Sequence, residues 1–270
     1  MPELPEVETI VRGLGPALAG RRVVGVEVRE RRLRTPVAPD FVARLVGRRI
    51  AGVSRHGKFL LAALDDGRVW LVHLGMSGRL TIAPAPPAPR AHDHVVVVLD
   101  DGRALTYHDP RRFGCLGVLE PSQVSAATGP GIDALSPALT AETVFTLTRR
   151  RRTSIKALLM DQRRVAGLGN IYVSELLFHA GVRPGRAAGR VSRPECERIV
   201  AAMRDVLADA IRLGGSSIND YRDGFGRSGC FQTTHQVYAR TGRPCPRCAA
   251  PIRERVIAGR STFYCARCQV

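Results

Sequence analysis

The chain has 270 residues, enough for one large domain or two smaller ones, and two are favoured. Its 41 Lys and Arg residues against 24 Asp and Glu give a net charge of +17. An excess of this size, mostly arginine, indicates a polyanionic partner such as nucleic acid, because the guanidinium fork matches phosphate geometry. No apolar run is long enough to cross a membrane and no signal-peptide core follows the N-terminus, so we expect an intracellular, cytoplasmic protein without a membrane partner.

The first eight residues, Met1-Pro-Glu-Leu-Pro-Glu-Val-Glu8, combine an amine with nearby carboxylates. If Met1 is removed, Pro2 becomes a secondary-amine N-terminus, and an α-amino group titrates near about 7.7–8.0. Its adduct with an aldehyde-level carbon is an iminium that acts as an electron sink, and Glu3 lies beside it as an acid. The alternative interpretation is that the prolines only begin a helix, since proline suits the first turn.

Periodicity predicts the elements that follow. Apolar residues from Pro5 to about Leu18 recur every three or four positions, which predicts an amphipathic helix that ends near Gly20. From Arg22 the period becomes two, with strands expected at 49–53, 59–64, 68–74, 80–83, 94–99 and 104–108. Turns at residues 65–67 and 100–102 join several of them as hairpins. Many short strands with close turns indicate an antiparallel sandwich or barrel, with the proline-rich residues 83–90 as a surface loop.

Beyond a non-periodic stretch at residues 129–137, the second half of the chain is helical. Helices are expected at 140–148, 153–163 and 171–180, and the clearest spans 192–213 with a Ser192 cap. Gly167, Gly169 and Asn170 precede the third of these, so their turn can bind a phosphate at the helix N-terminus. A helix–turn–helix packing joint is an equally open interpretation.

Four of the seven cysteines form two pairs near the C-terminus: Cys245-Pro-Arg-Cys248 and, after sixteen residues, Cys265-Ala-Arg-Cys268. This spacing is typical of structural zinc, and four thiolates leave no open position for catalysis. We therefore expect one structural zinc that holds a short β-hairpin and presents Arg260 near its tip.

Several motifs together resemble the bacterial formamidopyrimidine-DNA glycosylase family, which repairs oxidised guanine. They are MPELPEVET at 1–9, HLGMSGRL at 73–80, DPRRFG at 109–114, DQRRVAGLGNIYVSE at 161–175 and the four-cysteine finger. The resemblance implies an α+β fold: an N-terminal antiparallel β-sandwich with flanking helices, then a helix-two-turns-helix domain with a zinc-finger β-hairpin. The expected boundaries are 1–130 for the catalytic sandwich, 131–138 for a linker, 139–222 for the helical domain, 223–242 for a lesion-covering loop and connection, and 243–270 for the zinc finger.

The resemblance also implies the activity and its residues. The chain would be a monomeric bifunctional enzyme that excises oxidised purines from double-stranded DNA and then nicks the strand by β,δ-elimination, with zinc as its only cofactor. Met76, Arg111 and Phe113 would fill the gap that an everted base leaves. The full set implied is Pro2, Glu3 and Lys58 for catalysis; His73, Met76, His92, Arg111, Arg112, Phe113, Lys156, Asn170 and Arg260 for DNA binding; and Glu6, Ser217, Ile218 and Tyr221 for the lesion pocket.

Two departures and two alternatives accompany this interpretation. Cys230 stands where an aromatic residue is expected and Met160 where leucine is usual; Cys230 leaves the fine base preference open. One alternative is the endonuclease VIII-type activity on oxidised pyrimidines, against which Leu4 and Arg111 argue. The other is a catalytically inactive lesion-DNA-binding protein, against which the intact Pro2, Glu3 and Lys58 argue.

Overall fold

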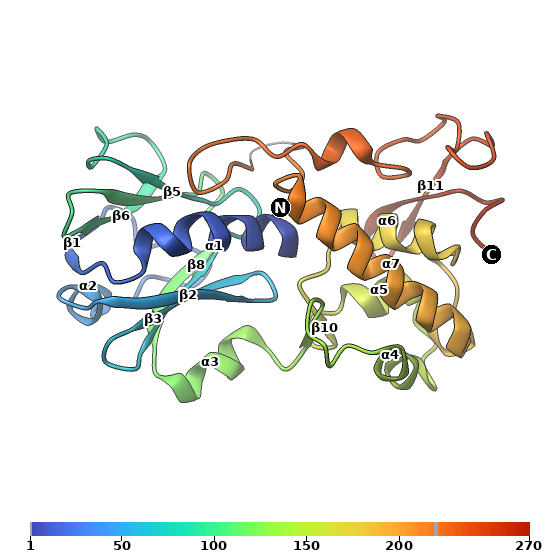
Figure 1. The fold of residues 1–270 in the computed structure, drawn as a ribbon, viewed down its shortest axis with the longest axis horizontal. Helices are drawn as coiled ribbons and strands as arrows, with labels where there is room; N and C mark the ends of the chain where they lie inside the picture. The colour runs from blue at the N-terminus through green and yellow to red at the C-terminus, as the bar shows by residue number, and fades with distance from the viewer. Residues whose placement is uncertain (1, 219–220) are drawn as a thin grey trace. The chain divides into compact units, whose positions relative to one another are not determined.

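The structure is a computed structural model that describes residues 2–218 and 221–270 (Figure 1). The chain divides into two compact units. The first consists of Met1–Thr128 and Leu213–Cys230, and the second of Gly129–Arg212 and Phe231–Val270. Met1 lies outside the described residues, as do residues 219–220 of the expected lesion-covering loop.

The first unit contains two four-stranded antiparallel sheets, as the sequence predicts. Their strand orders are β1-β6-β7-β5 and β2-β3-β4-β8 (Figure 1). The elements in chain order are α1 (Leu4–Leu18), β1 (Val23–Val28), α2 (Phe41–Leu45), β2 (Ile50–His56), β3 (Phe59–Leu64), β4 (Val69–His73), β5 (Arg79–Ala83), β6 (Asp93–Leu99), β7 (Ala104–His108), β8 (Cys115–Leu119) and α3 (Pro121–Thr128). Strands β3 and β7 have the predicted bounds, whereas α2, α3 and β8 were not predicted.

The inward-facing side chains of both sheets form one hydrophobic core. Alternate residues such as Leu105 and Tyr107 on β7 and Trp70 and Val72 on β4 are almost fully buried. Helix α1 packs against β2 and β3 and adds Val7, Ile10, Leu14 and Leu18 to the same core. Because a fully buried aliphatic side chain contributes about 1.5–3 kcal/mol, this apolar face fixes the position of the helix and of the residues that begin it.

The second unit is mainly helical. Its elements are β9 (Ile132–Asp133), α4 (Ala141–Thr148), α5 (Ile155–Met160), β10 (Val165–Ala166), α6 (Asn170–Ala180), η1 (Ala188–Arg190), α7 (Arg193–Arg212), η2 (Phe231–Thr234), β11 (Arg253–Ile257) and β12 (Arg260–Tyr264). Helix α6 is buried along nearly its whole length and packs against α7, α5 and β12. The β11–β12 hairpin carries the zinc-finger sequence, so the predicted α+β fold is confirmed (Figure 1).

The division into compact units differs from the expected domain boundaries at two segments. The expected linker contains β9, which pairs in parallel with β10 and so belongs to the second unit. Leu213–Cys230, whose first part lies within the expected bounds of the helical domain, groups with the first unit. The reason is local: the Ile82 N–H on β5 donates to the Gly224 carbonyl at 2.8 Å, and the Ser216 N–H donates to the Glu6 carboxylate at 2.7 Å.

Among the described residues, no helix combines the length and the apolar character that crossing a membrane requires.

Candidate active site and nucleic-acid interface

The start of helix α1 is buried and rigidly held. Pro2 and Glu3 are both buried, and the Glu3 N–H donates to Glu6 Oε2 at 2.7 Å. The other Glu6 oxygen, Oε1, accepts the Ser216 N–H at 2.7 Å. Glu6 is therefore a buried carboxylate that joins the first helical turn to a segment 210 residues away in sequence, in addition to interacting favourably with the helix dipole.

The residues expected around a bound base gather near Glu6. The Tyr221 hydroxyl donates to the Glu6 carbonyl at 3.3 Å, and Ser217 Oγ donates to the Tyr221 carbonyl at 3.0 Å. Gly215 has a φ of +81°, and a side chain there would meet Glu6 Oε1 at 2.7 Å, so this approach requires glycine. Ile218 has 44% of its surface exposed. The structure thus brings Glu6, Ser217 and Tyr221 together and leaves Ile218 accessible to a ligand.

Lys58 lies in the tight turn between β2 and β3 and is 7% exposed. Arg55, at the end of β2, controls the position of this turn: its Nε donates to Glu8 of α1 at 2.9 Å, and its guanidinium donates to the Gly57 carbonyl at 2.8 Å. The turn that carries Lys58 is thereby tied to the helix that begins after Pro2 and Glu3. Nothing in the sequence singled out Arg55 for this role.

His73 is held as a neutral ring. Burial, followed by the charges of Lys58 and Arg34, lowers its pKa to about 4. Its Nδ1 accepts the Gly75 N–H at 3.1 Å, which leaves Nε2 as the protonated nitrogen. A neutral imidazole in this tautomer can donate one hydrogen bond to a phosphate oxygen without adding charge.

Asp109 organises the two loops that carry Met76, Arg111 and Phe113. This carboxylate is fully buried. One oxygen accepts the Ser77 hydroxyl at 2.7 Å; the other accepts the Gly114 N–H at 2.9 Å and the Tyr107 hydroxyl at 3.3 Å.

The two loops also pack closely, with no room for a side chain at Gly75. A Cβ there would lie 2.3 Å from the carbonyl carbon of Phe113. The loop after β4 and the loop after β7 are therefore one rigid structure.

Arg111 and Phe113 are exposed on these loops, and Met76 is half-buried. Phe113 has 43% of its surface exposed, and the Arg111 guanidinium stacks on its ring at 4.7 Å from the centroid, a cation–π arrangement. Arg112, expected to bind a phosphate, is partly exposed and pairs with Glu30 at 3.2 Å. His92 is exposed, and its ring lies 6.0 Å from that of His108.

Lys156 and Asn170, two of the residues expected to bind DNA, both bond to the zinc-finger hairpin. Lys156 is fully buried, and its Nζ donates to the Ser261 carbonyl at 3.1 Å and to Thr262 Oγ1 at 2.7 Å. Asn170 Nδ2 donates to the same carbonyl at 3.0 Å. Arg260, next in sequence, is exposed. Lys156 and Asn170 thus both bond to the residue that follows Arg260, 105 and 91 positions later in the sequence.

Helix α6 begins one residue earlier than the sequence predicts. Gly169 occupies the N-cap position and Asn170 is the first helical residue, with its side chain bonded to the Ser261 carbonyl. The Gln162 side chain organises the turn: Oε1 accepts the Gly167 N–H at 2.9 Å, and Nε2 donates to the Leu168 carbonyl at 2.7 Å. Gly167 has a φ of +104°, so here the glycine is required.

The four paired cysteines form a metal site. Their sulfur atoms all lie within 4.8 Å of one another, with Cys245–Cys268 at 3.9 Å and Cys248–Cys265 at 3.5 Å. Tetrahedral zinc with Zn–S bonds of about 2.3 Å requires sulfur separations of about 3.8 Å, whereas a disulfide would need about 2.0 Å. The geometry fits one structural zinc, which would hold the hairpin in a closed four-thiolate site.

The finger is fastened to α6 independently of the metal. Arg247 stacks on the Phe178 ring at 4.5 Å and donates to the Phe178 carbonyl at 3.1 Å. Gln269 donates to the Val182 carbonyl at 2.9 Å, just beyond the helix. The metal site, which closes the hairpin, and these contacts, which attach the finger to α6, together fix the position of Arg260 relative to Lys156 and Asn170.

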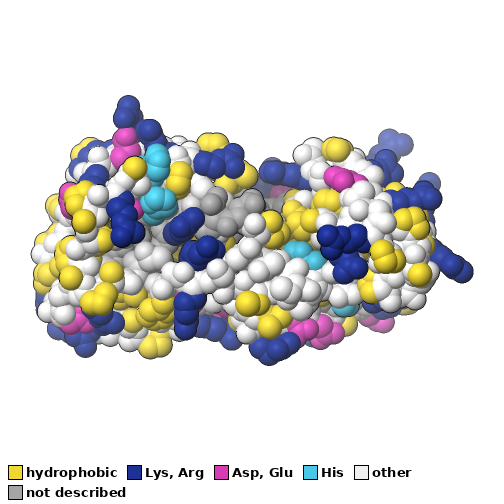
Figure 2. Space-filling view, turned by 90° about the horizontal axis from the view of Figure 1, so that it is seen from above, with side chains coloured by type: hydrophobic (Ala, Val, Ile, Leu, Met, Phe, Trp, Pro, Cys, Tyr) yellow, Lys and Arg dark blue, Asp and Glu magenta, His cyan; other side chains and the backbone are white. Residues whose placement is uncertain are grey.

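Basic side chains outnumber acidic ones on the face shown in Figure 2, consistent with the net charge of +17. Such a surface attracts a polyanion and speeds its encounter.

Asp109, Arg55 and Gln162 were missed in the sequence as positioning residues. Asp109 and Gln162 lie inside the motifs DPRRFG and DQRRVAGLGN, and their place in these motifs is the one sequence feature that points to a positioning role. Arg55 adjoins Lys58 in sequence, but its partner Glu8 is 47 residues away.

Models of three protein domains match the chain in order. These are the formamidopyrimidine-DNA glycosylase N-terminal domain at residues 1–116, the formamidopyrimidine-DNA glycosylase H2TH domain at 131–222, and the zinc finger found in FPG and IleRS at 242–270. Together they cover nearly the whole chain.

Full-length relatives agree with these matches. Formamidopyrimidine-DNA glycosylase of Thiobacillus denitrificans is 51% identical and that of Cereibacter sphaeroides 45%, with both chains covered over 100% of their length. The crystal structure of the MutM (Fpg) protein from Thermus thermophilus is 41% identical, with a TM-score of 0.88 over 99% of this chain and 98% of that one. Lactococcus lactis Fpg bound to DNA containing an AP site is 32% identical, with a TM-score of 0.89 over 99% of each chain.

Proposed function

Because the chain belongs to the formamidopyrimidine-DNA glycosylase family, we propose that it excises oxidised purines from duplex DNA and then cleaves the strand at the abasic site. The glycosylase activity is supported by full-length relatives that are named formamidopyrimidine-DNA glycosylases. Several solved relatives are bound to DNA with a Fapy-dG lesion or an AP site. The strand cleavage and the roles of individual residues rest on the chemistry of this chain.

The observation that carries the proposal is the buried start of α1. With Met1 removed, Pro2 is a secondary amine whose position is set by the α1 core residues and by the hydrogen bond from Glu3 to Glu6. Glu3 follows it directly and is 2% exposed. A nucleophile and an acid are therefore paired by covalent geometry within a rigid helix terminus.

The reaction begins with attack on the sugar. The Pro2 nitrogen forms a bond to C1′ of the damaged nucleotide, and the C1′–N bond to the base breaks, so the base leaves with the electron pair and takes up a proton. Glu3 gives its proton to the ring oxygen O4′ as the C1′–O4′ bond opens, which leaves an iminium between the Pro2 nitrogen and C1′. Lys58 contributes its charge to hold the adjoining phosphate.

Strand cleavage follows from the iminium. Because the iminium is an electron sink, the C2′ proton becomes acidic and is lost, and the 3′ phosphate leaves as the C3′–O bond breaks. Loss of a further proton expels the 5′ phosphate. Water then hydrolyses the adduct, which regenerates the free Pro2 amine.

Both units supply DNA-binding groups in this proposal. His73 would donate its Nε2–H to a phosphate, and Lys156, Asn170 and Arg260 would do the same from around the zinc-finger hairpin. Met76, Arg111 and Phe113 would occupy the space that the everted nucleotide leaves, supported by the Asp109 network.

Borohydride trapping tests the covalent step. Reduction of the iminium gives a stable tertiary amine that links protein to DNA, so the unmodified protein should be trapped on a duplex containing an oxidised purine, and Pro2→Gly should lose the rapid trapping. Pro5→Ala is the matched control, because it removes a proline from the same helical turn without removing the nucleophile. A cleaved lesion strand with no trapped adduct would overturn the covalent mechanism.

Glu3→Gln separates the two chemical steps. The amide cannot protonate O4′, so excision of an intact damaged base should slow far more than adduct formation on a preformed abasic site. A panel of lesion duplexes in the same assay distinguishes oxidised-purine from oxidised-pyrimidine activity, and the family matches do not favour the latter.

A further inference from the structure

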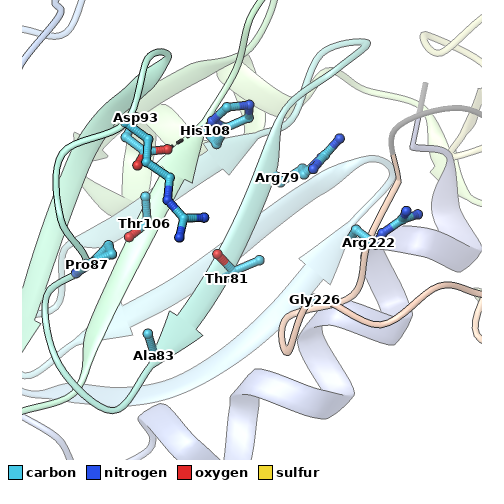
Figure 3. A pocket seen from close by; sticks show the side chains of 10 residues that line it. Arg79, Thr81, Ala83, Pro87, Asp93, Thr106, His108, Arg222 and Gly226 are labelled. Atoms are coloured by element: carbon cyan, nitrogen blue, oxygen red, sulfur yellow. Dashed lines mark hydrogen bonds and ion pairs between the residues drawn. The ribbon is translucent and has the colours of Figure 1, made fainter.

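The outward face of the sheet β1-β6-β7-β5 contains a hollow of about 420 Å³. Successive side chains along each strand alternate between the core and this face, and those on this face, the floor of the hollow, are mostly polar. Arg79 on β5 pairs with His108 on β7, which pairs with Asp93 on β6; Thr81 pairs with Thr106 in the next row. Figure 3 shows these side chains on the strands, with Arg222 on a separate segment beside the sheet.

Two segments build walls around this floor. The segment containing Arg222 and Gly226 is fixed to the sheet edge by the hydrogen bond from the Ile82 N–H to the Gly224 carbonyl at 2.8 Å. The Asp223 carboxylate holds the turn itself, accepting the Phe225 and Arg227 N–H groups at 2.9 Å each. On the opposite side, the proline-rich loop ends at Arg90, which also lines the hollow.

The hollow is strongly cationic. It is lined by three arginines, Arg79, Arg90 and Arg222, and by His108, against one carboxylate, Asp93. Asp93 is 7% exposed and is bonded to His108 Nδ1 at 2.9 Å. Within the described part of the chain, neither Arg90 nor Arg222 forms an ion pair with a carboxylate; the bond found for the Arg222 guanidinium, to the Tyr221 carbonyl at 2.9 Å, uses one of its five donors.

We propose that this hollow binds a phosphate group, and that in the DNA complex the group is a backbone phosphate of the duplex beside the lesion. The three guanidinium groups and two threonine hydroxyls that line the hollow are donors that suit phosphate oxygens. The assignment to DNA rests on the function proposed above and on continuity along the chain: Arg79 follows the Met76 loop by three residues, and His108 directly precedes Asp109.

The salt dependence of DNA binding tests the proposal. The double variant Arg90→Gln/Arg222→Gln is compared with the unmodified protein and with Arg12→Gln, which removes an exposed arginine of α1 that lies outside the hollow. The probe is a duplex with an abasic-site analogue. We expect the double variant to reduce the slope of log K against log salt by about 0.9 for one phosphate lost, whereas Arg12→Gln leaves the slope unchanged.

Two further arms identify the source of the phosphate. When the duplex is shortened on one side of the lesion, the unmodified protein should show the same reduced slope of log K against log salt as the double variant shows with the full duplex. The slope of the double variant should not change on that shortening. Inorganic phosphate, compared with chloride at equal ionic strength, should raise the melting temperature of the unmodified protein more than that of the double variant.

The outcomes are distinct. An unchanged DNA slope in the double variant refutes DNA as the source, and if inorganic phosphate also fails to stabilise selectively, it refutes the site. An equal slope change in Arg12→Gln refutes it too, because the effect would then be general charge. Borohydride trapping at saturating DNA monitors the chemistry separately: its absence in the unmodified protein would overturn the proposed function, whatever the slopes.

Discussion

Replacing Asp109 with asparagine should weaken the support of the two loops that carry Met76, Arg111 and Phe113. The carboxylate accepts three hydrogen bonds, at 2.7, 2.9 and 3.3 Å. Hydrogen bonds to a charged group are stronger than neutral ones by about 1 kcal/mol each, and the 3.3 Å bond from Tyr107 counts for less. Relief from burying a charge offsets part of the loss. We therefore expect a net destabilisation of about 1–2 kcal/mol, or a melting temperature lower by roughly 2–8 °C.

The catalytic consequence should depend on the substrate. Base excision requires the loop side chains to replace an everted base in the stack, and each 1.36 kcal/mol lost from the transition state slows a reaction by about tenfold. A preformed abasic site has no base to evert, and Asp109 contacts neither Pro2 nor Glu3. Single-turnover rates on lesion and abasic duplexes should therefore show a larger decrease for excision than for cleavage.

Two variants serve as controls for Asp109→Asn. Asp66→Asn makes the same chemical change in the β3–β4 turn, where the carboxylate bonds mainly to Arg68, and should leave the ratio of the two rates unchanged. Ser77→Ala removes one of the three donors and should have a smaller effect in the same direction. Equal slowing on both substrates by Asp109→Asn, or no loss of stability, would refute the view that this carboxylate supports base eversion through the loops.

Three other variants or treatments probe the rest of the site. We expect the unmodified protein to excise a lesion opposite cytosine about tenfold or more faster than one opposite adenine, because the Arg111 guanidinium can donate to both O2 and N3 of cytosine. Arg111→Ala should lose most of this preference. Excision rates measured against both partner bases test this, and equal rates in the unmodified protein would count against the role. Cys248→Ser or strong chelation should abolish DNA binding while circular dichroism shows the sandwich still folded, and undiminished affinity of the metal-free protein would exclude the finger from the interface. Because the pKa of His73 is lowered to about 4, its ring stays neutral in the folded protein at a pH where the unfolded chain already binds a proton. The free energy of unfolding should therefore decrease as pH falls from about 6.5 to about 4. Chemical denaturation should show a shallower decrease for His73→Asn, and a pH dependence identical to that of the unmodified protein would contradict the assignment.

Much of the local structure was readable from the sequence because it depends on local periodicity and covalent geometry. Alternation with period two located most of the sandwich strands, including β3 and β7 with their observed bounds. The apolar stripe from Val7 to Leu18 predicted the helix that positions Pro2 and Glu3. The four-cysteine spacing predicted the metal site, since two turns of fixed length bring each pair of thiols together. The short helices α2 and α3 were missed, because five to eight residues carry too little periodicity to stand out.

The sequence by itself determined which residues could do the chemistry: an N-terminal amine next to a carboxylate, basic residues for phosphates and thiols for zinc. The tertiary structure alone decided how they are held. Glu6 bonds to Ser216 across 210 residues, Lys156 reaches Thr262 across 106, and Asp109 bonds to Ser77 across 32. The hollow lined by Arg79, Arg90 and Arg222 likewise exists only in the folded sheet. Such contacts depend on the register and packing of distant backbone segments, and no local pattern of residue types records where two distant segments meet.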